Sequence, residues 1–234
     1  LCPQLGISIP VGKDSLSMKT TWFEEAGRFG EDLPAQQVSR SQNPAGMKKE
    51  VIAPLSLIVS AFAPVADARQ TLTPQLRSDC GETVLLLIDF SSGRSRLGGS
   101  SLAQAFGACG NETPDVDSPV ALVKFIKQKQ ILTDKRKILA YHDRSDGGLF
   151  AAVCEMMFAS RAGITLELHD IVAGKSLAEV LFNEELGVLL QVQRAGAEQI
   201  VQSFNAAGVP CSQIGVPSRD DVLRVQIDGI EVLC

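Results

Sequence analysis

The stretch that decides the fold reads YHDRSDGGLF and occupies residues 141–150. A run with high β-propensity at residues 137–141 leads into it, and an apolar pattern with helical spacing follows at residues 148–159. Between the two runs lie two aspartates three residues apart, a serine and a pair of glycines. The stretch therefore predicts a strand, a short acidic loop and a helix, in that order.

The acidic loop has the composition of a site for Mg²⁺ and phosphate. Asp143 stands near the end of the strand, and Mg²⁺ is a hard cation that takes few protein oxygens and shares the rest with phosphate and water. Gly147 and Gly148 would let backbone N–H groups approach an anion at the start of the helix, where the dipole favours negative charge. Asp and Ser are also common N-caps and Gly-Gly is a common turn, so helix capping is an equal alternative.

The rest of the chain alternates strand-like and helix-like patterns. We expect strands at residues 54–63, 83–90, 138–141, 163–168 and 187–192, helices at 101–108, 148–159, 177–182 and 195–207, and a hairpin over 222–233. A longer helix begins near Pro119, with Ser118 as its N-cap and a mostly apolar stripe at Val120, Val123, Ile126 and Gln130. These patterns predict an α+β fold, a layered mixed sheet with helices around one core.

The N-terminal part reads differently. We expect a short strand at residues 7–11 and a turn at 12–14. Residues 25–50 are rich in Glu, Gly, Pro, Gln, Ser, Asn and Lys, which is typical of a flexible connection. We therefore assign residues 1–50 to the tail of a preceding domain plus this connection, and residues 51–234 to a complete domain.

The composition excludes several functional classes. The net charge of −5, without a dominant basic block, argues against a nucleic-acid partner, and the longest apolar runs are far shorter than a membrane span. Six cysteines without a C-x-x-C pair and two histidines argue against a zinc site and for reduced thiols in the cytoplasm.

Five motifs occur in an order that resembles one known family. They are PVGKDSLSM at 10–18, PLSLIVSAF at 54–62, RLGGSSLAQ at 96–104, HDRSDGG at 142–148 and LFNEELG at 181–187. Together they resemble the large single-chain phosphoribosylformylglycinamidine synthases, or FGAR amidotransferases, over nearly the whole chain. The resemblance implies the C-terminal part of the second synthetase half, a domain like the C-terminal domain of aminoimidazole ribonucleotide synthetase. It also implies missing partners, the remaining synthetase domains and a glutaminase.

The resemblance implies a reaction and several site residues. The family converts formylglycinamide ribonucleotide to formylglycinamidine ribonucleotide with ATP and glutamine, by phosphorylating the amide oxygen and displacing the phosphate with ammonia. It makes Asp143 a Mg²⁺ ligand and Ser145 a nucleotide contact, in the half that holds an auxiliary Mg·ADP. The other metal ligands would lie in the preceding domain. No catalytic residue falls in this chain, so we expect the isolated chain to be inactive.

Further nucleotide contacts are candidates at two other loops. Gly98 and Gly99 precede a helix and follow Arg96, an arrangement that suits an anion, although glycine turns before helices are common. Lys13 lies in a sequence that fails the P-loop spacing, where a phosphate contact and a charged turn are both open. For residues 183–185 we expect a solvated turn, with a contact to a metal or a substrate hydroxyl as the alternative.

Two other readings remain open. One is another synthetase of the same superfamily, although the sequences at residues 10–18 and 182–187 resemble the large synthase more closely than that enzyme. The other is a scaffold domain that touches no nucleotide and packs on the missing domains.

Overall fold

The computed structural model describes residues 1–15, 18–25, 46–53, 56–172 and 174–234. Its backbone contacts define two compact units. One holds Ile7–Pro64 and the other holds Val65–Cys234, while the residues of the short helix α1, Cys2–Leu5, are divided between them. The division into domains after residue 50 stays a prediction.

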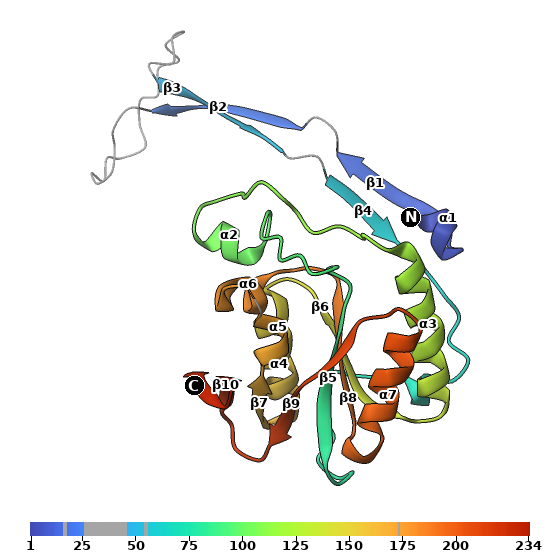
Figure 1. The fold of residues 1–234 in the computed structure, drawn as a ribbon. Coiled ribbons are helices and arrows are strands. Elements are labelled where there is room, and N and C mark those ends of the chain that lie inside the picture. The colour runs from blue at the N-terminus through green and yellow to red at the C-terminus, as the bar shows by residue number, and fades with distance from the viewer. Residues whose placement is uncertain (16–17, 26–45, 54–55, 173) are drawn as a thin grey trace, which may run out of the picture. The chain divides into compact units, whose positions relative to one another are not determined.

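The first unit consists of two antiparallel strand pairs (Figure 1). They join β1 (Val11–Ser15) to β4 (Ser56–Ser60), and β2 (Lys19–Glu25) to β3 (Gly46–Ile52). The predicted strand at 7–11 and turn at 12–14 are wrong, because pairing with β4 draws residues 12–14 into β1. Within the predicted connection 25–50, residues 25 and 46–50 belong to strands, and 26–45 lie outside the described residues.

The second unit is built on a seven-stranded sheet with the order β11-β10-β7-β9-β5-β8-β6. Every neighbouring pair is antiparallel except β7 with β10, which is parallel, so the sheet is mixed. The strands are β5 (Thr83–Asp89), β6 (Ile138–Arg144), β7 (Gly163–Glu167), β8 (Gly187–Gln193), β9 (Cys211–Ser218), β10 (Leu223–Ile227) and β11 (Ile230–Leu233). The predicted α+β fold with a layered mixed sheet is confirmed.

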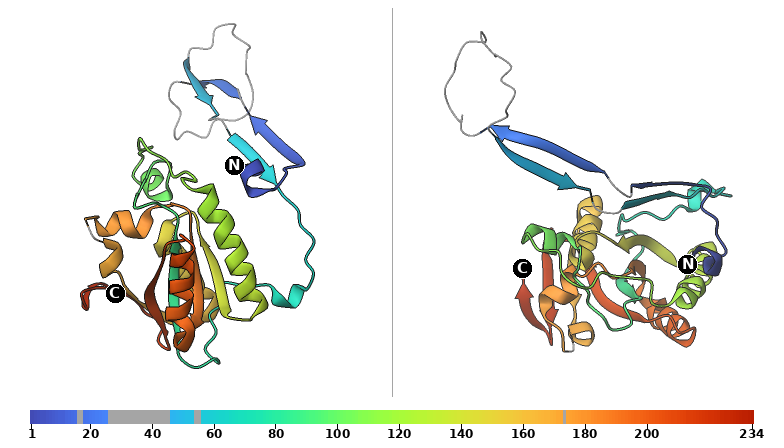
Figure 2. Two further views of the ribbon diagram at one scale, coloured as in Figure 1. Left: turned by 45° about the vertical axis from the view of Figure 1, so that its right-hand side comes forward. Right: turned by 90° about the horizontal axis from the view of Figure 1, so that it is seen from above.

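Helices cover both faces of this sheet (Figures 1 and 2). The helices are the 3-10 turn η1 (Ala68–Gln70), α2 (Ser101–Ala105), α3 (Pro119–Asp134), α4 (Gly148–Ser160), α5 (His169–Val172), α6 (Leu177–Phe182) and α7 (Arg194–Ala206). One apolar cluster joins the sheet to α4 and α6, and a second joins it to α3 and α7. In β5, Leu85 and Leu87 enter the first cluster while Val84, Leu86 and Ile88 enter the second, which explains its continuous apolar run.

Helix α3 presents a different face to the core from the predicted one. Ser118 caps it as expected, since its hydroxyl accepts from the N–H of Ala121 at 3.2 Å. Val120 and Ile126 are nevertheless 64% and 50% exposed, and Phe125 is buried instead. The reason is tertiary, because the Phe125 ring packs between Phe90 and Phe204, 5.5 and 5.9 Å away between centroids.

Most other boundaries agree with the sequence, with physical causes for the exceptions. α2 ends three residues early, because Gly107 adopts a positive φ of 65° and the N–H of Ala108 reaches back to the carbonyl of Ala103 at 2.8 Å. β9 was not predicted, since Gly215 and Pro217 interrupt its pattern; the glycine is required because a Cβ there would strike the carbonyl oxygen of Thr165. No helix in the described part of the chain is both long and apolar enough to span a bilayer.

Candidate functional site

The acidic loop leaves the sheet at the end of β6, an edge strand. The strand runs three residues further than predicted, to Arg144, so Asp143 is its penultimate residue. Asp143 is exposed, and its Oδ1 accepts a hydrogen bond of 2.7 Å from the hydroxyl of Tyr141. Burial and the Asp143 carboxylate raise the pKa of Tyr141, which keeps the phenol protonated as a donor. One Asp143 oxygen is thereby oriented on the rigid strand.

A hollow of about 310 Å³ opens beside this carboxylate. Its lining consists of His142, Asp143, Ser145, Asp146, Ala152 and Glu155. The Nδ1 of His142 donates to the carbonyl oxygen of Asp143 at 2.8 Å, and its Nε2 lies 2.6 Å from a carboxylate oxygen of Glu155 on α4. The hollow therefore combines an oriented carboxylate, a hydroxyl and two further carboxylates. Within the ranges that the structure describes, no three His, Cys, Asp or Glu side chains lie close enough together to hold a metal ion.

The glycine pair has a structural role beside any contact with an anion. Gly147 and Gly148 have φ angles of 80° and 68°, a region that disfavours other residues. A Cβ on Gly148 would lie 2.6 Å from the carbonyl oxygen of Asn183. The loop thus closes directly on the backbone that follows α6, and any residue larger than glycine would push the two apart.

Residues 183–185 do not form a solvated turn, which corrects our expectation, because Asn183 and Glu185 are buried and Glu184 is half-buried. Asn183 is 4% exposed and Glu185 is fully buried. Glu184 Oε1 accepts from the N–H of Gly147 at 2.7 Å and from the N–H of Ser101 at 2.8 Å. Glu184 Oε1 therefore joins the acidic loop to the start of α2. The N–H of Gly147, which we expected to approach a bound anion, donates to this carboxylate instead.

The second glycine loop is likewise filled by the protein's own backbone. The N–H of Gly98 donates to the carbonyl of Glu112, and that of Gly99 donates to the carbonyl of Cys109, both at 2.7 Å. A Cβ on Gly98 would collide with the same Glu112 carbonyl. Close approach of two backbone segments accounts for the glycine, and nucleotide contacts of Gly98 and Gly99 stay predictions.

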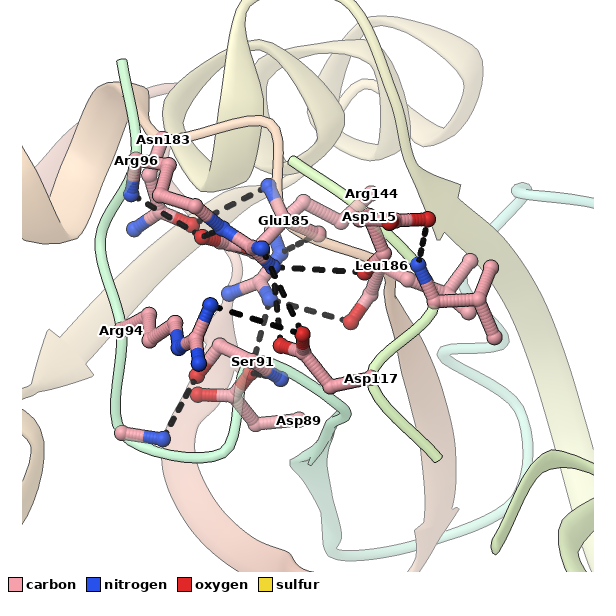
Figure 3. A network of polar contacts seen from close by, with 12 residues as sticks. Asp89, Ser91, Arg94, Arg96, Asp115, Asp117, Arg144, Asn183, Glu185 and Leu186 are labelled. Atoms are coloured by element: carbon pink, nitrogen blue, oxygen red, sulfur yellow. Dashed lines mark hydrogen bonds and ion pairs between the residues drawn. The ribbon is translucent and has the colours of Figure 1, made fainter. Parts of the chain in front are cut away.

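Arg96 belongs to a buried network of charges (Figure 3). Its Nε and Nη2 donate to the two carboxylate oxygens of Glu185 at 2.7 and 2.6 Å, and Nη2 also donates to Asp117 at 2.9 Å. The Arg96 side chain is 7% exposed, whereas Arg94, which lies 3.6 Å from Asp117, is 58% exposed. The guanidinium of Arg96 thus has two carboxylate partners within the fold, and its contact with a phosphate stays a prediction.

Arg144 is a key residue that our sequence reasoning missed. It is 4% exposed at the end of β6, and its Nε donates to the backbone carbonyl of Glu185. Its Nη2 donates to Asp89 Oδ1 at 2.8 Å and to the carbonyl of Leu186 at 3.1 Å. A Cβ on Gly187 would lie 2.8 Å from Arg144 Nε, so the guanidinium occupies the space beside that glycine. The sequence signal that could have identified Arg144 is its position between Asp143 and the Asp146-Gly147-Gly148 turn.

The site residues come from three neighbouring segments of one unit. Residues 96–101, 143–148 and 183–187 are joined through Glu184, Glu185 and Arg144. Lys13 belongs to the other unit, where its backbone pairs with that of Ile58 in β4.

This architecture defines a class, an α+β domain in which an acidic strand–loop–helix turn rests on buried arginine–carboxylate pairs. A family model described as "AIR synthase related protein, C-terminal domain" matches residues 81–228. The chain belongs to this family. A second model, described as "FGAR-AT PurM_N-like domain", matches residues 1–38.

Solved structures of PurL from Thermotoga maritima share the fold. The protein complexed with ATP has 13% sequence identity and a TM-score of 0.55, and the match covers 80% of this chain and 28% of that one. The FGAR complex has 13% identity and a TM-score of 0.58, with 80% and 30% covered. The PurLQS assembly from the same organism has 12% identity and a TM-score of 0.54, with 80% and 28% covered. The chain therefore spans less than a third of the length of these proteins.

Replacing Glu185 by glutamine tests the buried network. We expect the free energy of unfolding to fall by about 3 kcal/mol, because Arg96 loses the charge that compensates its burial. Urea denaturation measures the change. The matched control is Glu231→Gln, whose partner Arg224 lies 3.8 Å away in a partly exposed pair, and its cost should stay below about 1 kcal/mol. Equal losses in the two variants would contradict a central role for the Arg96–Glu185 pair.

Asp89 should contribute a pH dependence of stability. Burial raises the pKa of its carboxyl, but the charge of Arg144 and the N–H of Ser91 outweigh this, so the pKa lies below its ordinary value. A lowered pKa in the folded state gives stability that is present above the unfolded value of about 4 and is lost as the pH falls through the folded pKa. Asp89→Asn should therefore flatten the acid side of the stability–pH curve measured by urea unfolding. Equal flattening by Asp134→Asn, which removes an exposed carboxylate, would refute this assignment.

Proposed function

We propose that this chain is part of an ATP- and glutamine-dependent ligase that converts formylglycinamide ribonucleotide to formylglycinamidine ribonucleotide in purine biosynthesis. The position we propose is the C-terminal part of the second synthetase half of a single-chain phosphoribosylformylglycinamidine synthase. Three observations support the proposal: membership of the AIR synthase related family, the second family model over residues 1–38, and the order of the five motifs. The shared fold with PurL, which was solved with ATP, ADP and FGAR, agrees with it.

Within that ligase, the chain contributes half of an auxiliary Mg·ADP site at the acidic loop. The observation that carries this role is the exposed Asp143 carboxylate, which Tyr141 orients at the mouth of a hollow of about 310 Å³. Asp143 presents a carboxylate, the donor type that Mg²⁺ takes, whereas Glu155 lies against the imidazole of His142. The donor chemistry therefore fits the metal, with Asp143 as its ligand.

The nucleotide contacts follow from the same geometry. Ser145 lines the hollow beside Asp143, so its hydroxyl is placed to donate to a phosphate oxygen. Gly147 already donates to Glu184, so its main contribution, with that of Gly148, is the tight turn that holds Ser145 in place. Mg²⁺, when bound, offsets the negative charge of the phosphates. We assign the remaining metal ligands to the preceding synthetase domain.

The chain acts together with the missing synthetase and glutaminase domains, in the cytoplasm. It carries no catalytic residue in this proposal, so the purified 234-residue chain should not form the amidine from FGAR, ATP and glutamine. Chromatographic detection of that product would overturn the assignment.

A scaffold domain without nucleotide contact is the second candidate. Phe106 and Phe158 favour it, since these large apolar side chains are 82% and 76% exposed and suit a surface that packs on other domains.

Calorimetric titration of Mg·ADP onto the chain separates the two candidates. We expect the wild-type chain to bind and Asp143→Asn to lose at least about tenfold in affinity, because metal sites depend steeply on their carboxylates. Asp170→Asn removes an exposed carboxylate on α5 and serves as the control that should bind like the wild type. Equal affinity of the wild type and Asp143→Asn would refute the acidic-loop site. No binding by any of the proteins would favour the scaffold.

A further inference from the structure

A second, larger hollow lies at the opposite end of α4 from the acidic loop. Its volume is about 690 Å³, and its walls come from the start of β5, the end of α4, the start of α7 and the end of β9. The two hollows share no lining residue, and the one beside the acidic loop reaches along α4 as far as Glu155. All of its lining residues belong to the second compact unit.

The charge of this hollow is strongly positive. Four arginines line it, against one carboxylate, Glu82; the arginines are Arg77, Arg161, Arg194 and Arg219. They come from four different segments, in a chain whose net charge is −5. Guanidinium groups that converge from separate segments repel one another, and an anion between them converts that repulsion into attraction.

Two of the arginines have carboxylate partners at the rim. Arg77 pairs with Asp79 at 2.6 Å, and Arg194 pairs with Glu82 at 3.0 Å. Arg161 and Arg219 form no ion pair with any residue in the part of the chain that the structure describes. Their charges are therefore available to a ligand, and the planar fork of a guanidinium matches the oxygens of a phosphate group.

The backbone position of Arg161 adds a second observation. Arg161 ends α4 in the left-handed region at φ 50°, a position that favours glycine. Its N–H bonds to the carbonyl of Met157, so the backbone that carries the guanidinium is fixed beside the hollow. Glycine would adopt this φ angle with less backbone strain, but it would not carry the positive charge of Arg161.

The start of α7 adds a third observation. A smaller hollow of about 370 Å³ shares Glu82 and Arg194 with the large one and reaches Ala195, in the first turn of α7. This 13-residue helix has no side-chain cap at Gln193 and no acidic residue in its first turn. The N–H of Arg194 donates to the carbonyl of Glu82 at 2.9 Å, and the positive end of the α7 dipole adds to the field of the arginines.

We propose that the arginine-lined hollow binds a multivalent oxyanion of the phosphate class, either free pyrophosphate or the phosphate tail of a nucleotide. Arg161 and Arg219 make charge-assisted hydrogen bonds to it, and Arg77 and Arg194 set the surrounding potential. This site is separate from the acidic loop and needs no metal, because the guanidinium groups themselves neutralise the anion.

Titration of inorganic pyrophosphate onto the full 234-residue chain in EDTA tests the proposal. We expect binding by the wild type, weakening with added salt, and a loss of about tenfold for each of Arg161→Gln and Arg219→Gln. The matched controls are the single variants Lys127→Gln and Arg136→Gln, each of which removes one positive charge from an exposed position outside the hollow and should bind like the wild type. Arg161→Lys and Arg219→Lys keep the charge without the fork and should fall between, and thermal unfolding checks that each variant folds.

The outcomes are distinct from those of the acidic-loop proposal. Pyrophosphate binding that Asp143→Asn leaves unchanged and the arginine variants weaken supports the hollow, whatever Mg·ADP does at the other end of α4. A parallel titration of ADP in EDTA identifies the source of the anion. Binding of ADP that depends on Arg161 indicates a nucleotide tail, and binding of pyrophosphate without ADP indicates a free anion. Absence of pyrophosphate binding at millimolar concentration, or equal binding by the Gln variants, would overturn the proposal.

Discussion

The structure depends first on the buried pair between Arg96 and Glu185. A fully buried carboxylate is stable only with close compensation, and Glu185 receives three hydrogen bonds from Arg96, one from its backbone N–H and two from its guanidinium. The backbone carbonyl of the same glutamate accepts from Arg144, which in turn pairs with Asp89. One residue thereby fixes the loop after β5, the end of β6 and the start of β8, the three places from which the candidate site is built.

The acidic loop is held in place by its contacts with residues 183 and 184, next to Glu185. Gly148 packs on the backbone of residue 183, and Glu184 ties Gly147 to the start of α2, so the loop has two fixed points beneath Asp143 and Ser145. Functional side chains act best when the residues below them hold them in place. The exposed carboxylate of Asp143 therefore lies beside a loop that is held at Gly147 and Gly148. The sequence of the loop does not show these contacts.

The two hollows at the ends of α4 carry opposite charge. The N-terminal end faces the acidic loop and the C-terminal end faces Arg161, an arrangement that the helix dipole favours at both ends. The proposed metal–nucleotide site and the proposed phosphate-class anion site thus lie in two differently charged surroundings. The two hollows share no lining residue, so substitutions can address each site independently.

The sequence by itself determined the fold class and most elements of the second unit. Apolar runs predicted β5 and β8, alternation predicted β7, and helical spacing predicted α4, α6 and α7, while the Asp228-Gly229 turn, with both residues at positive φ, predicted the terminal hairpin. The tertiary structure alone decided that Glu185 is buried, that Arg96 and Arg144 hold the fold, which face of α3 meets the core, and that four distant arginines share a hollow. The physical reason is that periodicity reports how a residue sits on its own strand or helix. Charge pairing and cavity walls depend on segments that lie up to 142 positions apart, from Arg77 to Arg219, and meet only when the sheet is assembled.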